Sequence, residues 1–251
     1  MIIQDRDRRL LRELGTMRAI DREVAKLVAG FGSTTRTNTR LLKLTRAGLL
    51  KRFFTGTIAG GRKAVYMLSR SGAALVDVPA VGLPRRQDET VVNDLFLDHQ
   101  MGINQVFCTV KFRPIPREKT QFVRWLGFHH HLSQSVPLVP DGYFELNVRG
   151  EIRPMFVEVD QGSESLRVWQ RKTQLYVHLA ISGEYTRIFG QRQFRTLVIA
   201  PSVRRLDAIR NKIAESTDKI FRLTTADRIN TEDFWSATWF RPQGDQPEPL
   251  V

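Results

Sequence analysis

The sequence of 251 residues contains a single cysteine, Cys108. One cysteine excludes an intrachain disulfide framework, a zinc site built from several cysteines and a paired-cysteine redox motif. Cys108 also lacks the paired base that would mark a nucleophile, so we expect it to be buried. This scarcity of cysteine is typical of a protein in a reducing compartment.

Long hydrophobic runs are also missing. No stretch of about 18 uncharged apolar residues occurs, and the N-terminal MIIQDRDRRLLREL has no apolar segment of signal-peptide length. We therefore expect a cytoplasmic protein that makes no contact with a membrane. With 41% hydrophobic and 26% charged residues, the chain can bury a sizeable core, in one large domain or two small ones.

Acidic residues are scarce in the N-terminal third. The chain carries 39 Lys and Arg against 26 Asp and Glu, and residues 1–86 hold 18 of these cations but only 6 of the acids. Between Glu23 and Asp77 there are ten Lys and Arg and no acid. Ten cations without an anion repel each other unless a partner neutralises them, whereas a merely solvated surface usually mixes both signs. Nucleic acid is the first partner that this segment predicts.

The apolar spacing predicts three helices and a hairpin in this third. Residues 5–14 and 20–29 have helical periodicity, and a third helix follows the turn GFGSTT and ends near Gly48. Residues 50–58 and 64–68 then read as the two strands of a hairpin with a basic tip. One side of the third helix is polar and basic, as in a helix that reads the major groove. The candidate DNA-binding residues of the helix and the hairpin tip are Arg36, Thr37, Asn38, Arg40, Lys43, Arg62 and Lys63.

This order of elements resembles a winged helix-turn-helix over about residues 4–78. The stretches LLKLTRAGLLKRFF and GGRKAVYMLSRSGAALV carry the resemblance. In such domains the third helix enters the major groove and the wing touches the backbone or the minor groove, so the resemblance implies contact with double-stranded DNA. A winged helix that docks a protein is the alternative.

Prolines and a glycine in VPAVGLPRRQD indicate a domain boundary near residues 78–88. We predict a winged helix-turn-helix at residues 1–80, a second domain at 88–240 and a flexible, Pro-rich tail at 241–251. The second domain reads as helix, three strands, helix, strand, helix and strand. This order predicts a meander followed by a parallel strand in a mixed sheet flanked by helices, an α+β or α/β fold.

Acidic residues lie at two strand ends of this domain. Pro140-Asp141 opens one strand, and Glu158-Val159-Asp160 closes the next. If the two strands pair, Asp141 can lie across from Glu158, and alternation puts Glu158 and Asp160 on one face. Clustered carboxylates suit Mg²⁺ or Mn²⁺, so Asp141, Glu158 and Asp160 are candidate metal ligands. A structural role for the three acids, as turn, cap or salt-bridge residues, is the alternative.

The second domain resembles the PD-(D/E)xK, or restriction-endonuclease-like, fold through its element order and through Pro140, Asp141 and Glu158. The resemblance implies that Asp141 and Glu158 hold a metal and that a lysine two positions after Glu158 orients the attacking water. Asp160 occupies that position instead. Some members supply the lysine from the following helix, and Lys172 is then the candidate. Asp141, Glu158, Asp160 and Lys172 are thus the candidate catalytic residues.

The combination of both halves resembles the replication-relaxation family of plasmids and other mobile elements. The stretches LFLDHQMGINQV, VPDGYFEL and FVEVDQGSESLRVWQRKTQLY carry the resemblance. It implies a DNA-binding protein linked to replication or relaxation, whose nuclease-like domain could nick or cleave DNA with Mg²⁺ or Mn²⁺. The alternative is a non-catalytic regulator of replication or transcription whose degenerate nuclease fold serves dimerisation or partner docking. A homodimer and contacts with replication or mobilisation proteins fit either hypothesis.

Overall fold

The computed structural model describes every residue except 1, 57–60, 80–93 and 230–231. The chain divides into two compact units, Met1–Asn104 and Gln105–Val251. Most of the predicted boundary stretch, and Ala59 and Gly60 of the predicted hairpin turn, lie outside the described residues. None of the described helices is both long and apolar enough to span a membrane.

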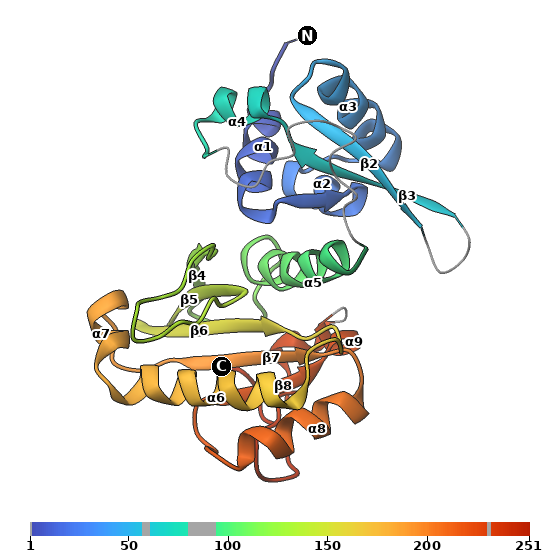
Figure 1. Ribbon diagram of the computed structural model, residues 1–251. Coiled ribbons are helices and arrows are strands. Elements are labelled where there is room, and N and C mark those ends of the chain that lie inside the picture. The colour runs from blue at the N-terminus through green and yellow to red at the C-terminus, as the bar shows by residue number, and fades with distance from the viewer. Residues whose placement is uncertain (1, 57–60, 80–93, 230–231) are drawn as a thin grey trace. The chain divides into compact units, whose positions relative to one another are not determined.

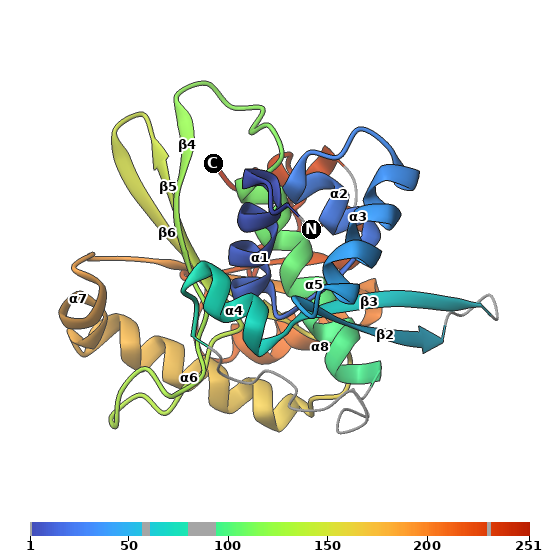
Figure 2. The same cartoon turned by 90° about the horizontal axis from the view of Figure 1, so that it is seen from above.

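The first unit contains three helices followed by a hairpin, in the order that the sequence predicts (Figures 1 and 2). Strand β1, which the sequence analysis missed, pairs with β3 and completes a three-stranded antiparallel sheet of order β1-β3-β2. The elements are α1 (Asp5–Met17), β1 (Ala19–Asp21), α2 (Arg22–Ala29), α3 (Thr34–Arg46), β2 (Leu50–Gly56), β3 (Arg62–Leu68) and α4 (Arg70–Val76).

Side-chain caps fix where the helices of this unit begin. The Asp21 carboxylate accepts a hydrogen bond from the Val24 amide (2.8 Å) at the start of α2, and Ser33 Oγ accepts from the Arg36 amide (3.3 Å) at the start of α3. Such caps satisfy backbone donors that have no partner within the helix. Leu41 and Leu44 of α3 are fully buried, as their spacing predicts.

The first unit extends further along the chain than the predicted domain. Helix α5 (Asp94–Lys111) begins in this unit and ends in the second. Its residue Leu97 packs with Val65 and Met67 of β3, and Asn104 Nδ2 donates to the carbonyl of Ala19 (2.6 Å). The N-terminal half of α5 therefore belongs to the core of the first unit.

The second unit is built on a mixed sheet of order β4-β5-β6-β7-β8. Strands β4, β5 and β6 form an antiparallel meander, and β7 and β8 continue the sheet in parallel, which confirms the predicted mixed sheet flanked by helices. The elements are β4 (Thr120–Leu126), β5 (Gly142–Val148), β6 (Glu151–Val159), α6 (Leu166–Ile181), α7 (Glu184–Phe189), β7 (Arg195–Ala200), α8 (Val203–Ala214), β8 (Phe221–Thr225), α9 (Ala226–Ile229) and the 3-10 turn Glu232–Trp235.

Helices α6 and α8 cover one face of this sheet (Figure 1). Trp169 and Tyr176 of α6 and Ile209 of α8 are fully buried against strand residues that include Phe156 and Phe221. Burying one such side chain contributes about 1.5–3 kcal/mol relative to leaving it in water. This packing holds the N-terminal half of α6 beside the C-terminal end of β6, where the predicted acids lie.

Residues 241–251 do not form the flexible tail that the sequence predicts. Trp239 and Glu248 form a β-bridge with backbone hydrogen bonds of 2.8 and 3.1 Å. Leu250 is fully buried, and its carbonyl accepts a hydrogen bond from Arg195 Nη1 (2.7 Å). The prediction was wrong because it rested on the prolines and charges of this segment and gave no weight to Leu250, whose burial holds the segment against the fold.

Candidate nuclease-like site and DNA-binding surface

Glu158 is the centre of a buried polar cluster at the end of β6. Its side chain is almost completely buried, and Lys172 Nζ lies 2.9 Å from its Oε2 atom. The Tyr176 hydroxyl donates to Oε1 at 2.6 Å. Lys172 and Tyr176 are four residues apart on α6, so they lie on the same side of that helix. One helix thus supplies both donors to one carboxylate, and the structure brings the candidate residues Glu158 and Lys172 together.

Asp141 lies next to Glu158 because of the pairing between β5 and β6. It directly precedes β5, and its Oδ2 atom accepts a hydrogen bond from the Val159 amide (2.7 Å). The next residue, Gly142, packs under the ring of Trp125, where a Cβ atom would lie only 2.4 Å from the ring. Glycine therefore permits Trp125 of β4 to pack closely against the start of β5, the strand that Asp141 precedes.

The cluster shifts the protonation of its members in different ways. Burial raises the pKa of Glu158 to about 7, despite the opposing charge of Lys172, and the charge of Asp141 adds to the rise. Burial disfavours the charged form of Lys172, but the carboxylates of Glu158, Glu164 and Asp141 together raise its pKa above the ordinary value. Lys172 therefore stays charged, while Glu158 can gain or lose a proton near neutral pH.

Asp160 is not arranged as the metal ligand that the sequence predicts. Arg205 of α8 binds it with two hydrogen bonds, from Nε (2.7 Å) and Nη2 (2.9 Å). Trp169 Nε1 donates to it at 3.2 Å and the Gly162 amide at 2.9 Å. Burial opposes the charged form, but these bonds lower the pKa of Asp160 below its ordinary value. Asp160 is thus a carboxylate held by Arg205, and Arg205 offsets the negative charge that Asp160 brings in place of a lysine.

Glu164 is a member of the cluster that the sequence analysis missed. Its Oε1 atom lies 2.9 Å from Lys172 Nζ. Its Oε2 atom is buried and accepts no hydrogen bond in the described part of the chain. Glu164 lies in the irregular segment before α6, where neither helical nor strand periodicity indicates the direction of a side chain.

The donor set fits one divalent cation bound by few protein ligands. Across the described residues, no three His, Cys, Asp or Glu side chains converge as a metal site. Mg²⁺, however, usually binds through one or two carboxylates and keeps several waters. Asp141 and Glu158 can provide those carboxylates. The unsatisfied Glu164 oxygen and the excess of acidic over cationic side chains in the cluster also suit a bound cation.

The predicted DNA-binding residues of the first unit divide into exposed and buried ones. Arg36, Asn38 and Lys43 of α3 are exposed, as is Arg62 at the start of β3. Lys63 pairs with Asp21 (2.6 Å) but remains half exposed. These side chains are accessible to a nucleic acid.

Thr37 and Arg40 do not fit the role that the sequence predicts for them. Thr37 is fully buried, and its hydroxyl donates to the carbonyl of Ser33 (2.8 Å). Arg40 Nε donates to the buried carboxylate of Asp7 (2.7 Å), and its Nη2 atom binds both Asp7 and the carbonyl of Ile2. Thr37 shares the spacing of Leu41 and Leu44, a signal that could have placed it in the core. Asp7 lies 33 residues before Arg40, so no local pattern indicated this pair.

A comparison with family models agrees with the resemblance seen in the sequence. A family model described as Replication-relaxation matches residues 9–191, which include Asp141, Glu158 and Lys172. Among solved structures, the restriction endonuclease FokI is similar with a TM-score of 0.36 and 13% identity. That match covers 89% of this chain and 42% of FokI, so this chain spans less than half the length of that enzyme. No curated protein matches the sequence.

Proposed function

The chain belongs to the replication-relaxation family, and we propose that it is a cytoplasmic DNA-binding protein of a plasmid or other mobile element that nicks or cleaves DNA with a divalent cation. The observation that carries this proposal is the contact between Lys172 Nζ and Glu158 Oε2 beside Asp141. Hydrolysis of a phosphodiester needs hard oxygen ligands and a fixed positive charge near the phosphate. These three side chains supply both, and replication or mobilisation proteins would be natural partners.

Each side chain of the cluster has a separate task in this proposal. Asp141 and Glu158 would hold Mg²⁺ or Mn²⁺, which when bound polarises a phosphoryl oxygen and lowers the pKa of a bound water. Lys172 would face the phosphate and offset the charge that develops during attack. Tyr176 keeps Glu158 in position through its hydroxyl, and Arg205 keeps Asp160 from adding negative charge.

The proposal predicts metal-dependent cleavage of supercoiled plasmid. Purified protein with Mg²⁺ or Mn²⁺ is expected to produce nicked or linear DNA, because a charged Lys172 and two carboxylates are already assembled. Gel electrophoresis of time points measures the product. Glu158→Gln protein and a chelator control should both leave the plasmid supercoiled. Product that survives either control would come from another nuclease, and a wild-type protein that binds plasmid without cutting it would contradict the proposed activity.

A non-catalytic regulator is the second candidate, and one observation favours it. Both oxygens of Glu158 and both oxygens of Asp160 already accept hydrogen bonds from protein donors. A site satisfied in this way can be purely structural, since buried carboxylates need such partners for stability. In that case the second unit would serve dimerisation or docking, and a mobility shift without cleavage is the expected result.

The exposed cations of α3 are the proposed contacts with double-stranded DNA. The variant Arg36→Ala/Lys43→Ala is expected to bind duplex DNA more weakly, and the slope of log K against log salt should fall by about 1.8 as two phosphate contacts are lost. Titration of a labelled duplex at several salt concentrations measures both effects. Arg12→Ala/Arg22→Ala, with cations removed from α1 and α2, is the matched control. An unchanged slope in the α3 variant, or an equal loss in the control, would refute the assignment of α3.

A further inference from the structure

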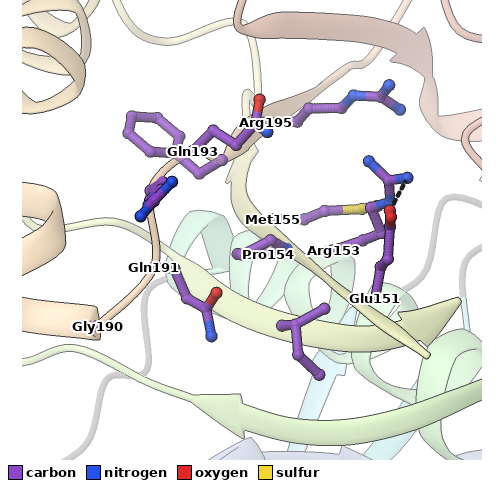
Figure 3. Close-up of a pocket in the computed structure, with 11 residues that line it drawn as sticks. Glu151, Arg153, Pro154, Met155, Gly190, Gln191, Gln193 and Arg195 are labelled. Carbon is purple, nitrogen blue, oxygen red and sulfur yellow. Dashed lines mark hydrogen bonds and ion pairs between the residues drawn. The ribbon is translucent and has the colours of Figure 1, made fainter.

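Three adjoining hollows lie at the end of the second unit's sheet where β5 turns into β6. The first, about 470 Å³, lies between the start of β6 and the loop that precedes β7 (Figure 3). The second, about 520 Å³, shares Glu151 and Arg153 with the first, and the third, about 390 Å³, shares Arg149 with the second. The first two hollows share walls on one face of the sheet and form one continuous surface, which we call the basic groove. The third hollow opens on the opposite face, beside Gln121 and Asn147, and is not part of the groove.

The basic groove collects positive charge. Of the charged side chains that line it, only Glu118 and Glu151 are acidic. The cationic ones are Arg117, Arg149, Arg153, Arg192 and Arg195. Residues 87–251 as a whole are almost neutral, with 21 Lys and Arg against 20 Asp and Glu. Four of these acids precede Gln105, so the second unit itself carries 21 Lys and Arg against 16 Asp and Glu, and the groove holds part of this excess.

Little within the chain neutralises this charge. Glu151 pairs with Arg153 at 2.5 Å (Figure 3), but both side chains are about half exposed or more, and such surface pairs contribute little. Arg195 donates only to an uncharged carbonyl, that of Leu250. Burial and the charge of Arg153 both lower the pKa of Arg195, as expected where cations crowd together. In the described part of the chain, Arg149 forms no ion pair, and neither does Arg192.

The basic groove is separate from the acidic cluster. Glu151 begins β6 and Glu158 lies seven residues later near its end. At about 3.3 Å per residue, the two places are roughly 20 Å apart along the strand. Cations in the groove therefore cannot contact a phosphate that is bound at Glu158. The function of the groove has to be explained separately from the acidic cluster.

We propose that the basic groove is a second contact surface for the phosphate backbone of double-stranded DNA. Arginine suits this task because its planar guanidinium binds phosphate with two hydrogen bonds. The lining is better suited to the DNA backbone than to unpaired bases. Among the described lining residues the aromatic one is Phe194, which is buried and therefore offers no ring on which a base could stack. The groove holds DNA without reading its sequence. This inference rests on the proposed DNA-binding function and adds a site that the first unit does not supply.

The test removes two exposed cations of the groove from the full chain. In Arg149→Asn/Arg192→Ala, asparagine replaces Arg149 because its φ of 55° is one that asparagine tolerates. Titration of labelled duplexes of two unrelated sequences is expected to show roughly 10- to 30-fold weaker binding at 0.15 M salt for both, with the salt slope reduced by about 1.8. The loss should add to that of Arg36→Ala/Lys43→Ala.

The matched control is Arg187→Ala/Lys212→Ala. It removes two cations of the same unit, but each already pairs with an acid three residues away in the sequence, Arg187 with Glu184 and Lys212 with Glu215. Affinity and slope should stay at the wild-type values. If the groove variant keeps the wild-type slope, the inference is overturned while DNA binding through α3 stands. If the wild-type chain binds no DNA, the proposed function itself fails. If the double variant has a lower melting temperature than the wild type, the test is repeated with Arg192→Glu, a single substitution at an exposed residue.

Discussion

Replacing Lys172 with methionine is expected to slow DNA cleavage by about 10²–10³-fold, the range seen when one fixed charge or donor is removed from a transition state. Methionine keeps most of the volume of the side chain but removes its charge. Glu158 and Glu164 then lose the cation that lies 2.9 Å from each of them. Glu158 would also hold its proton to higher pH, because burial and Asp141 already raise its pKa to about 7. Single-turnover rates of plasmid nicking with saturating protein measure the effect.

The control for this variant is Lys212→Met, the same chemical change on α8, where the lysine pairs with Glu215 on the surface. Its cleavage rate should equal that of the wild type. Lys212→Met should also bind duplex DNA with wild-type affinity, and rates measured with saturating protein separate the loss of chemistry in Lys172→Met from any loss of binding. A Lys172→Met protein that cuts within tenfold of the wild-type rate would remove Lys172 from the mechanism and leave only its structural pairing.

The spacing of residues in the chain was enough to predict that Asp141 and Glu158 lie close together. Asp141 opens a strand and Glu158 closes the next, so hairpin pairing brings them together once the meander forms. Lys172 could be predicted only with the help of the family resemblance. Lys172 lies four residues before Tyr176, on the side of α6 that also contributes to the core. Helical spacing alone therefore could not distinguish a side chain that contacts Glu158 from one that only packs in the core.

Pairs that are distant in sequence account for the errors. Asp160 meets Arg205, 45 residues later, and Arg40 meets Asp7, 33 residues earlier. Helical or strand periodicity gives the face on which a charged residue lies but not the partner that packs against it. A count of charged residues has a similar weakness, because it adds the charges of a whole segment and does not show where on the surface they gather. The net charge of residues 87–251 is close to zero, so it gave no sign of the cations that gather in the basic groove.

The arginines of the two units lie in two different environments. Arg40 and Arg205 each bind a buried carboxylate with two hydrogen bonds, and such pairs keep a charged group stable where water is excluded. Arg36, Arg149 and Arg192 are exposed instead. We expect substitutions in the first group to lower the stability of the fold and substitutions in the second group to lower DNA affinity alone.

Replacing Arg205 with methionine is expected to lower the free energy of unfolding by about 3–5 kcal/mol at neutral pH, the range for removing one partner of a buried ion pair. The Asp160 side chain is completely buried and that of Arg205 is 17% exposed, so little water can replace the guanidinium. Hydrogen bonds from Trp169 and Gly162 remain, but they cannot neutralise the charge. Urea unfolding followed by circular dichroism measures the difference between variant and wild type.

The pH dependence of that difference identifies Asp160 as its source. Arg205 holds the pKa of Asp160 below its ordinary value, so its contribution to stability is complete above about pH 4 and is lost as the pH falls further and the carboxylate is protonated in the folded protein. The gap between wild type and Arg205→Met should narrow in acid. The double variant Asp160→Asn/Arg205→Met should recover part of the loss at pH 7, because it buries no uncompensated charge. A gap that stays constant with pH, with no recovery in the double variant, would mean that Arg205 stabilises the fold through packing and not through Asp160.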